Sequence, residues 1–394
     1  MKCLVLNADY PEYLSSFYTQ HPGLENKSYD EQIRVRNESL FGTVDFYSGN
    51  LRKLGVEAYD IYINNEFMQK AWAREHLRGL QKSSPTTRQC RKIFRQAVRI
   101  ASKTPLRRLR SLVPAKIRSA SDDGWYYDIL AAQIREMKPD IVLNEAMNWL
   151  SSDFLREIKP QMRLLVGQHA ATKLRDENDY TVYDLVVSSF PPTLDWFRRK
   201  GIPAEMNRLG FEPKVLSYIQ TAEKEFDVTF VGRFFSGIYD SRARFLELLS
   251  ERIEHTKIWG TGVEELPATS SIRRCYVGQA WGREMYQILR KSRITLNHHG
   301  DIAPYANNMR LYEATGTGAL LVTDWKENLH EIFEPGKEVV AYKTPEECLD
   351  LVKYYLDHDQ KREAIAQAGQ ERTLREHTYY QRMQELMAII RNYL

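Results

Sequence analysis

The sequence predicts an α/β protein made of two doubly wound domains in series, which face a shared cleft. Short apolar runs alternate with helical stretches in two series, the first ending near residue 207 and the second beginning near residue 227. Continuous apolar runs of this kind are typical of parallel strands that are covered by helices on both faces. Ligands of such sheets bind outside the carboxyl ends of the strands, so we expect the functional residues there.

The first series opens with the apolar run 2–7. A helical pattern follows over 28–55 and ends at Gly55, because glycine commonly terminates helices. The other strands expected in this series are 57–64, 140–145, 163–169 and 183–189, and the other helices are 122–140 and 191–203.

The second series has strands expected at 227–234, 255–262, 292–300, 318–324 and 338–342, and a long helical stretch at 344–377. Little apolar periodicity occurs between the two series, which indicates a linker. The predicted division is a first domain (1–210), a linker (211–226), a second domain (227–375) and a C-terminal helix (376–394).

The composition fits a folded chain of this size. At about 150 residues per domain, 394 residues suggest two or three domains, and 43% hydrophobic residues can bury a sizeable core. No apolar run approaches the roughly 18–20 residues needed to cross a bilayer, and the first apolar stretch is too short for a signal peptide. The four cysteines match neither a zinc site nor a disulfide framework. We therefore expect a cytoplasmic protein.

A basic segment interrupts the first domain. Residues 82–118 contain 12 lysines and arginines and no acidic residue, although the net charge of the whole chain is only +4. One interpretation is an insertion, at about 82–120, whose apolar stripe packs on its own domain. A basic amphipathic helix that lies on an acidic membrane is a second interpretation. Contact with an anionic acceptor or with nucleic acid is a third.

The stretch 307–324, NNMRLYEATGTGALLVTD, combines binding chemistry with a turn into a strand. Asn307 and Asn308 can offer amide donors, and the start of a helix just after them attracts phosphate. Arg310 can hold a diphosphate through two hydrogen bonds. Glu313 shares its helix face and can accept the hydroxyl groups of a ribose. The alternative is a surface Arg–Glu pair followed by a helix C-cap.

A second candidate is the turn 230–242, FVGRFFSGIYDSR, in which a strand ends at Gly232 and a helix begins after a short loop that contains Arg233. This arrangement suits phosphate binding. The spacing is neither that of a dinucleotide-binding fingerprint nor that of a P-loop, so an ordinary βα turn stays open as the alternative.

Three polar residues follow strands of the first domain and are candidates for the group that binds or deprotonates an acceptor: Asp9, Glu145 and His169. His169 is preferred because histidine titrates near neutral pH. Each of the three has the alternative of a loop polar group or a helix cap. His298 and His299 follow a strand of the second domain, where neighbouring side chains point to opposite faces, so at most one of them faces the cleft.

Six landmarks in order carry a resemblance to a known family: FVGRF, IWGTG, SRITLNHHGD, NNMRLYEATGTGALLVTD, IFEPGKEVVAY and REHTYYQRMQEL. Over about residues 226–390 the chain resembles the CgeB-like (spore-maturation-type) glycosyltransferases, which belong with the group 1 and family 4 enzymes of the GT-B fold. The stretches YPEYL, YTQHPGLENKSYDEQ and MQKAWARE are also similar to such chains, more loosely. The resemblance implies a GT-B fold with two Rossmann-like domains and a C-terminal helix that crosses back to the first domain.

The resemblance also implies roles for single residues. Glu313 matches the second glutamate of the family's E-x7-E motif, which binds the ribose of the nucleotide, and Arg310 matches an arginine usual just before it. Gly232 and Arg233 match the glycine-rich phosphate loop. Tyr305 stands in place of the first glutamate of the motif, which contacts the donor sugar in the wider family, so the resemblance leaves the donor sugar and the details of the mechanism open.

The predicted function is transfer of a sugar from a nucleotide-diphosphate sugar to a glycan, lipid or protein acceptor, with retention of configuration as the resemblance implies. The expected catalytic residues are His169, Arg233 and Arg310, and the expected donor-binding residues are Gly232, Arg233, Asn308, Arg310 and Glu313. No metal and no cofactor is expected, because arginines can stabilise the diphosphate and no Asp-x-Asp motif lies in a loop that suits a metal-dependent enzyme.

Under the second interpretation of the basic segment 82–118, a further partner is the acidic inner face of a membrane. No nucleic-acid partner is expected. Two alternatives to the transferase stay open. One is a sugar-nucleotide epimerase, which would bind the same donor, and the other is a non-catalytic GT-B relative, which the replacement at Tyr305 favours.

Overall fold

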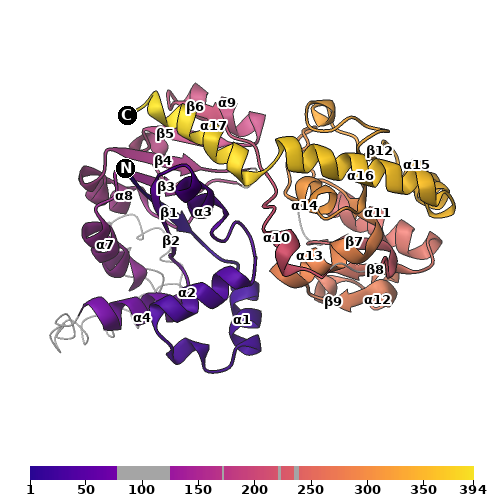
Figure 1. Cartoon of the computed structure of the whole chain (residues 1–394), viewed down its shortest axis with the longest axis horizontal. Helices are drawn as coiled ribbons and strands as arrows, with labels where there is room; N and C mark the ends of the chain where they lie inside the picture. The colour runs from indigo at the N-terminus through magenta and orange to yellow at the C-terminus, as the bar shows by residue number, and fades with distance from the viewer. Residues whose placement is uncertain (78–124, 171–172, 221–222, 235–238) are drawn as a thin grey trace, which may run out of the picture.

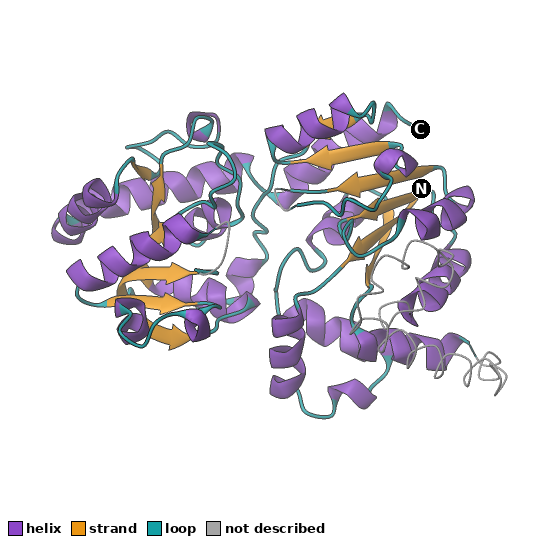
Figure 2. Cartoon of the chain, turned by 180° about the vertical axis from the view of Figure 1, so that it is seen from behind, coloured by secondary structure: helices purple, strands orange, loops and turns teal. Residues whose placement is uncertain are grey.

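The computed structural model describes residues 1–77, 125–170, 173–220, 223–234 and 239–394. In this part of the chain, two parallel sheets of six strands each form two α/β domains, and helices pack on both faces of each sheet (Figure 1, Figure 2). The predicted fold class, two doubly wound domains in series, is therefore confirmed.

The first sheet has the strand order β2-β1-β3-β4-β5-β6. The strands are β1 (Lys2–Asn7), β2 (Glu57–Tyr62), β3 (Ile141–Asn144), β4 (Leu164–Gln168), β5 (Leu185–Ser188) and β6 (Ala204–Met206). The order reverses between β1 and β3, which pair in parallel with Leu6 opposite Asn144.

The second sheet has the strand order β12-β11-β10-β7-β8-β9. The strands are β7 (Phe226–Val231), β8 (Thr256–Trp259), β9 (Tyr276–Gly278), β10 (Ser292–Asn297), β11 (Leu320–Asp324) and β12 (Val340–Tyr342). Here the order reverses between β7 and β10, which pair with Phe230 opposite Leu296.

Helices connect most successive strands, as is usual in parallel sheets, and the 3-10 turn η6 (Leu329–Glu331) lies between β11 and β12. Those of the first half are α1 (Pro11–Gln20), α2 (Tyr29–Glu38), α3 (Phe46–Lys53), α4 (Glu66–His76), α7 (Trp125–Met137), α8 (Ser152–Ile158), α9 (Pro191–Arg199) and α10 (Val215–Tyr218). Those of the second half are α11 (Asp240–Arg252), α12 (Ser271–Cys275), α13 (Gly282–Lys291), α14 (Arg310–Gly316), α15 (Pro345–Asp357), α16 (Asp359–Glu376) and α17 (Tyr379–Arg391). Single 3-10 turns are η1 (Leu24–Asn26), η3 (Lys159–Gln161), η4 (Tyr180–Val182), η5 (Val263–Glu265) and η6 (Leu329–Glu331).

Two expected helices are broken. The pattern 28–55 forms α2 and α3, which are separated by a loop in which several residues, Gly42 among them at 65°, have positive φ angles. The Ser39 carbonyl in this loop accepts a hydrogen bond of 2.7 Å from the backbone N–H of Arg283 in the second domain. A tertiary contact therefore overrides the local helical pattern. The pattern 344–377 likewise divides at His358 into α15 and α16.

The edge strands β6 and β9 were missed by the sequence analysis. Each has three residues, and most of their side chains are half-buried or exposed. No continuous apolar run marks such a strand, so its formation depends on pairing with a neighbour that the sequence does not reveal.

The chain crosses between the domains twice, and the two crossings meet. Phe211 of the first crossing pairs with Thr378 of the second in an isolated parallel bridge. After this point α17 lies on the first domain (Figure 1), with the ring of Tyr379 5.4 Å from that of Phe46 in α3. One buried apolar cluster spans the junction and includes Leu51, Leu311 and Leu386.

Two features of the chain concern membranes. Among the described residues, no helix is both long enough and apolar enough to cross a bilayer. The basic segment 82–118 lies outside the described residues, so its amphipathic helix and its contact with an acidic surface stay predictions.

Candidate active site

The candidate site lies at the carboxyl edge of the second sheet, where the strand order reverses. The chain runs from β7 outward to β8 and β9, and then returns to β10 on the other side of β7. A crevice for ligands forms at this position in doubly wound sheets. Gly232 and Arg233 follow β7, and His298 and His299 follow β10, so all four residues lie at this edge.

Gly232 takes part in a close approach between two strand ends. Its N–H donates to the Trp259 carbonyl at 3.0 Å, and a Cβ on Gly260 would lie 1.8 Å from the Gly232 carbonyl oxygen. Gly260 has a φ of 152°. A side chain at Gly260 would therefore push apart the loops that follow β7 and β8. The absence of a side chain at Gly260 allows these two loops to lie close together.

Arg310 and Glu313 form a buried ion pair at the base of this edge. Nη1 of Arg310 lies 2.8 Å from Oε2 of Glu313, with 12% and 8% of the two side chains exposed. Nη2 of Arg310 donates to the carbonyl of Val231, the last residue of β7, at 3.1 Å. The spacing that the sequence analysis singled out thus places both residues directly below the end of β7.

The electrostatic environment of Glu313 reflects this burial. Burial raises the pKa of the Glu313 carboxyl group, while the charge of Arg310 and a hydrogen bond with Tyr286 act to lower it. A carboxylate that is buried with one cation and one hydroxyl donor is held in place. Arg310 and Glu313 therefore form a buried ion pair within the site. They are not the exposed surface pair that the sequence analysis gave as the alternative.

Arg233 lies at the border between the domains. Its Nη2 is 3.5 Å from Oε1 of Glu12 in α1, and about half of each side chain is exposed. Its backbone carbonyl accepts from Nη1 of Arg242 at 2.6 Å, which fixes the loop after β7. An exposed guanidinium whose one side-chain partner among the described residues is a distant carboxylate is available to a phosphate, because exposed ion pairs contribute little stability.

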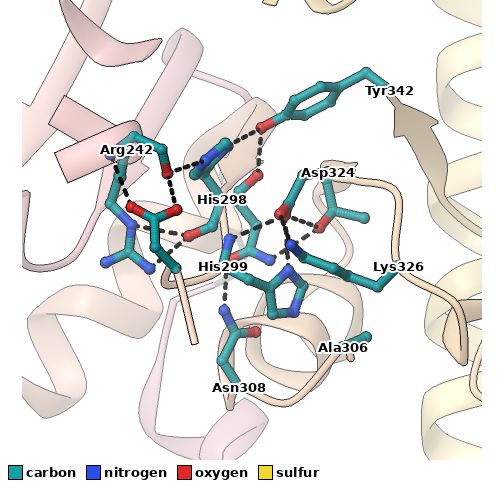
Figure 3. Close-up of polar contacts among 12 residues, drawn as sticks. Arg242, His298, His299, Ala306, Asn308, Asp324, Lys326 and Tyr342 are labelled. Carbon is teal, nitrogen blue, oxygen red and sulfur yellow. Dashed lines mark hydrogen bonds and ion pairs between the residues drawn. The ribbon is translucent and has the colours of Figure 1, made fainter. Parts of the chain in front are cut away.

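Arg242 and His298 contact each other at the end of β10 (Figure 3). Nε of Arg242 donates to the His298 carbonyl at 2.8 Å. The His298 ring lies between Ser241 Oγ, 3.0 Å from Nε2, and the Tyr342 hydroxyl, 2.9 Å from Nδ1. Burial lowers the pKa of His298. Both ring nitrogens of His298 therefore have hydrogen-bond partners within the second domain, and the role of this side chain is structural.

His299 points the other way and contacts Asp324 at the end of β11. Its backbone N–H and its Nδ1 lie 3.0 Å and 2.7 Å from Oδ1 of Asp324, and Lys326 Nζ lies 3.1 Å from Oδ2. Burial acts to raise the pKa of Asp324, but the contacts with His299 and Lys326 lower it well below its usual range. Asp324 is thus an ionised carboxylate that only accepts hydrogen bonds.

Asn308 approaches the same strand ends from the turn before α14. Its amide nitrogen donates to Oδ1 of Asn297 at 2.8 Å, and the amide of Asn297 donates to Thr323 Oγ1 at 2.9 Å. Asn308 Oδ1 and Asn307 Nδ2 are buried without a hydrogen-bond partner within the described residues. His299 Nε2, at the end of β10, is likewise buried without a hydrogen-bond partner among these residues.

His169 lies in the other domain. It follows β4 at the carboxyl edge of the first sheet, its side chain is buried, and its N–H donates to the Val187 carbonyl at 3.1 Å. No contact in the described chain joins it to Arg233 or Arg310. The structure therefore brings together the candidates of the second domain and leaves His169 apart from them.

The carboxyl groups of Asp9 and Glu145 have different hydrogen-bond partners. Nε of Arg36 donates to Oδ2 of Asp9 at 3.2 Å and Nη2 of Arg36 contacts Oδ1, so both carboxylate oxygens are occupied. The sequence-based suggestion that Asp9 acts as a base is not supported by this geometry. Glu145 accepts from Thr43 Oγ1 at 3.0 Å, and burial raises its pKa to about 7.

Tyr305 lines a pocket at the domain junction. The pocket has walls from both domains, with Met206 and Arg208 on one side and Ala306 and Asn307 on the other. The Tyr305 ring lies edge-on to Phe190 at 6.3 Å. Tyr305 thus makes an interdomain aromatic contact instead of presenting a carboxylate.

The His299–Asp324–Lys326 group was not assembled by the sequence analysis. The two parallel strands that carry it end in register, with Asn297 opposite Thr323. The polar residues that follow two apolar runs, LNHH and LVTD, were the available signal. Among the described residues, no group of three or more His, Cys, Asp or Glu side chains is arranged to hold a metal ion.

Comparison with known proteins finds a family match in the second half of the chain and a shared fold over the whole chain. Residues 242–388 match the family model described as glycosyl transferase-like. This segment contains Arg310, Glu313 and the His299–Asp324 contact, and it lies within the span for which the resemblance was argued. No curated protein matches the chain at a significant level.

Solved structures share the architecture at low sequence identity. Anabaena Alr3699/HepE in complex with UDP-glucose is 11% identical with a TM-score of 0.59, and the match covers 100% of both chains. A glycosyltransferase from Rickettsia africae ESF-5 is 11% identical with a TM-score of 0.55, covering 100% of this chain and 98% of that one. The chain therefore has the GT-B fold.

Proposed function

We propose that this protein is a glycosyltransferase that moves a sugar from a nucleoside-diphosphate sugar to an acceptor, without a metal ion and with retention of configuration. The observation that carries the proposal is the buried Arg310–Glu313 pair at the carboxyl edge of the second sheet, within the matched segment. A fold shared with transferases does not by itself assign an activity, so the chemistry of these residues is what supports it.

The main chemical demand is stabilisation of the leaving diphosphate. Negative charge grows on this group as the glycosidic bond breaks, and fixed cations stabilise it most effectively where water is excluded. Besides Glu313 and Val231, the guanidinium group of Arg310 contacts only the sulfur of Met285 among the described residues, at 3.3 Å from Nη1 and 3.2 Å from Nη2. A thioether is a weak acceptor, so a phosphate oxygen could replace it as the partner of these N–H groups. Arg233 lies at the neighbouring loop with an exposed guanidinium. These two arginines are the proposed diphosphate-binding groups, with the Gly232 loop between them.

Glu313 is the proposed ribose-binding group. A carboxylate can accept hydrogen bonds from two adjacent hydroxyl groups, and Arg310 fixes the orientation of Glu313 from one side. Asn308 would contribute from the turn before α14, beside the strand ends. Nucleotide, diphosphate and sugar would then follow one another along the sheet edge.

The acceptor would bind on the first domain, with His169 as its base or hydrogen-bond partner. Buried Glu145, whose pKa is raised to about 7 by burial, offers a second acid–base group at the switch point of that sheet. A CgeB-like subtype, a glycan, lipid or protein acceptor, and a cytoplasmic location at the inner membrane face through segment 82–118 are parts of the same proposal.

A non-catalytic sugar-nucleotide-binding protein is a second candidate, because Tyr305 packs against Phe190 where the resembled enzymes carry a glutamate. Binding and turnover separate the candidates. Transfer or donor hydrolysis supports the transferase, interconversion of the donor without acceptor supports an epimerase, and tight binding without turnover supports the non-catalytic protein.

The first test is calorimetric titration with UDP, GDP, ADP and TDP. UDP leads the panel because HepE, which shares the fold, was solved with UDP-glucose. We expect one nucleotide to bind, and Glu313→Ala to weaken its affinity at least about tenfold, since hydrogen bonds to charged groups are worth about 1.5–3 kcal/mol. Glu334→Ala is the matched control, because Glu334 is exposed and pairs with Lys337. Unchanged affinity in Glu313→Ala would refute the ribose role, and no binding by the wild type would refute the proposal.

A further inference from the structure

Asp324 sets the direction of two hydrogen-bonded chains that start from its carboxylate. In the first chain, Oδ1 of Asp324 accepts from Nδ1 of His299 at 2.7 Å. In the second, Thr323 Oγ1 donates to Asp324 Oδ1 at 3.4 Å, Asn297 Nδ2 donates to Thr323 Oγ1 at 2.9 Å, and Asn308 Nδ2 donates to Asn297 Oδ1 at 2.8 Å. Every donor therefore points toward the carboxylate.

The direction of the chains fixes which atoms lie at their far ends. An ionised carboxylate offers no proton, so the ring proton of His299 lies on Nδ1 and Nε2 carries a lone pair in the neutral ring. In the same way Asn308 donates an amide N–H to Asn297, which leaves Oδ1, an acceptor, at the far end of the second chain.

Both end atoms are acceptors, and both are buried. His299 is 4% exposed, and neither His299 Nε2 nor Asn308 Oδ1 has a hydrogen-bond partner in the part of the chain that the structure describes. A buried acceptor without a partner is costly. Figure 3 shows the His299 ring with one edge toward Asp324 and the rest toward the turn that carries Ala306 and Asn308.

We propose that His299 Nε2 and Asn308 Oδ1 form a subsite that binds hydroxyl groups of the transferred sugar. Two acceptors match hydroxyl donors, and they would repel phosphate oxygens, which are also acceptors. This inference rests on the proposed function and names what occupies one end of the donor.

The position of the subsite agrees with the order of a sugar nucleotide. Arg310 and Glu313 lie below the end of β7, whereas His299 and Asp324 follow β10 and end β11, the next two strands in the sheet. Neighbouring strands are about 4.8 Å apart. A donor whose ribose lies at Glu313 would therefore extend its sugar across the sheet edge toward His299.

Two conservative variants separate binding from a merely structural role. The amide of His299→Asn can reproduce the Nδ1–H contact with Asp324 but has no atom at the place of Nε2. The longer side chain of His299→Gln can bring an acceptor oxygen to that place. If His299 only holds Asp324 in place, His299→Asn should keep its function. If His299 binds the sugar, His299→Gln should keep more of its function than His299→Asn.

The experiment measures, by calorimetry on the full chain, the affinity for the nucleoside diphosphate that binds best and for its glucose conjugate. We expect the wild type to prefer the conjugate and His299→Asn to reduce this preference about tenfold or more, with the affinity for the free diphosphate within about twofold. His299→Gln should keep more of the preference. His255→Asn is the control for the substitution itself, because His255 is exposed and its φ of 64° suits asparagine.

Other outcomes overturn one proposal or the other. If His299→Asn keeps the preference and His299→Gln loses it, the ring is structural and the subsite is refuted. If the wild type binds the diphosphate and its glucose conjugate equally, the subsite is refuted while the proposed function stands. If His299→Asn melts far below the wild type, Asn308→Ala takes its place with the same readout, and an unchanged preference there refutes the subsite.

Discussion

Phe211 and Thr378 lie opposite each other where the two crossings between the domains meet. The Phe211 N–H donates to the His377 carbonyl at 2.8 Å, and the Tyr379 N–H donates to the Phe211 carbonyl at 2.9 Å. The Phe211 ring also packs against the end of α14, where a Cβ on Gly316 would lie 2.5 Å from it. Helix α14 carries Arg310 and Glu313 as well, so the domain junction and the candidate donor site share one rigid element.

Gly316→Ala tests this shared element. The added methyl group would overlap the Phe211 ring, and overpacking of this kind costs about 1–3 kcal/mol. We expect a lower melting temperature together with weaker nucleotide binding. Gly49→Ala in α3 is the matched control, because its Cβ would meet nothing closer than 3.8 Å and alanine favours a helix. Equal melting temperatures for Gly316→Ala and the wild type would contradict a tight junction.

Arg310→Met tests the buried ion pair by leaving Glu313 without its cation. Removing one partner of a buried pair costs about 3–5 kcal/mol, and we expect a loss of this order in urea unfolding. The pKa of Glu313, which burial already raises, should rise further. The double variant Arg310→Met with Glu313→Gln should recover part of the loss. Additive losses in the double variant would show that the two side chains do not interact.

Asp9→Ala tests the pair that holds the loop between α2 and α3. Asp9 forms an ion pair with Arg36, and both side chains are 2% exposed. Arg36 also donates to the Phe41 carbonyl in this loop at 3.1 Å. We expect a loss of about 3–5 kcal/mol, measured by urea unfolding. Glu38→Ala is the comparison, because its ion pair with Arg34 is largely exposed and should contribute at most about 1 kcal/mol. Similar losses in both variants would mean that burial does not strengthen the first pair.

Asp60→Asn tests the pH dependence of stability. Burial raises the pKa of Asp60 to about 7 from a model-compound value of 3.8. Between these values the folded protein binds more protons than the unfolded chain, so stability falls as the pH rises. The neutral variant should lose this slope and exceed the wild type by about 1–3 kcal/mol at pH 8. Urea unfolding at pH 5 and pH 8 measures it, and parallel profiles would contradict the prediction.

Much of the fold could be predicted because buried parallel strands are continuous apolar runs. Ten of the twelve strands lie where such runs occur, whereas β6 and β9 are short, partly exposed edges. The break between α2 and α3 was missed because a contact between Ser39 and Arg283 of the other domain determines it. Local patterns report local preferences, and both misses depend on distant partners.

The candidate site shows the same limit. The i, i+3 spacing of Arg310 and Glu313 placed them on one helix face, and the structure places them in contact. His299 was recognised as one of a vicinal pair, but its contact with Asp324 requires the register of β10 and β11. The direction of a hydrogen-bonded chain is a property of several elements together, and no single stretch of sequence contains it.

Helix α17 belongs to the first domain in space but follows the second domain in the chain. Its apolar residues, among them Met383 and Leu386, pack in the cluster that covers the first sheet. A ribosome therefore makes the second domain before it makes the helix that completes the first. A nascent chain arrested before Tyr379 would expose apolar surface in its older half, although its newer half could already be folded.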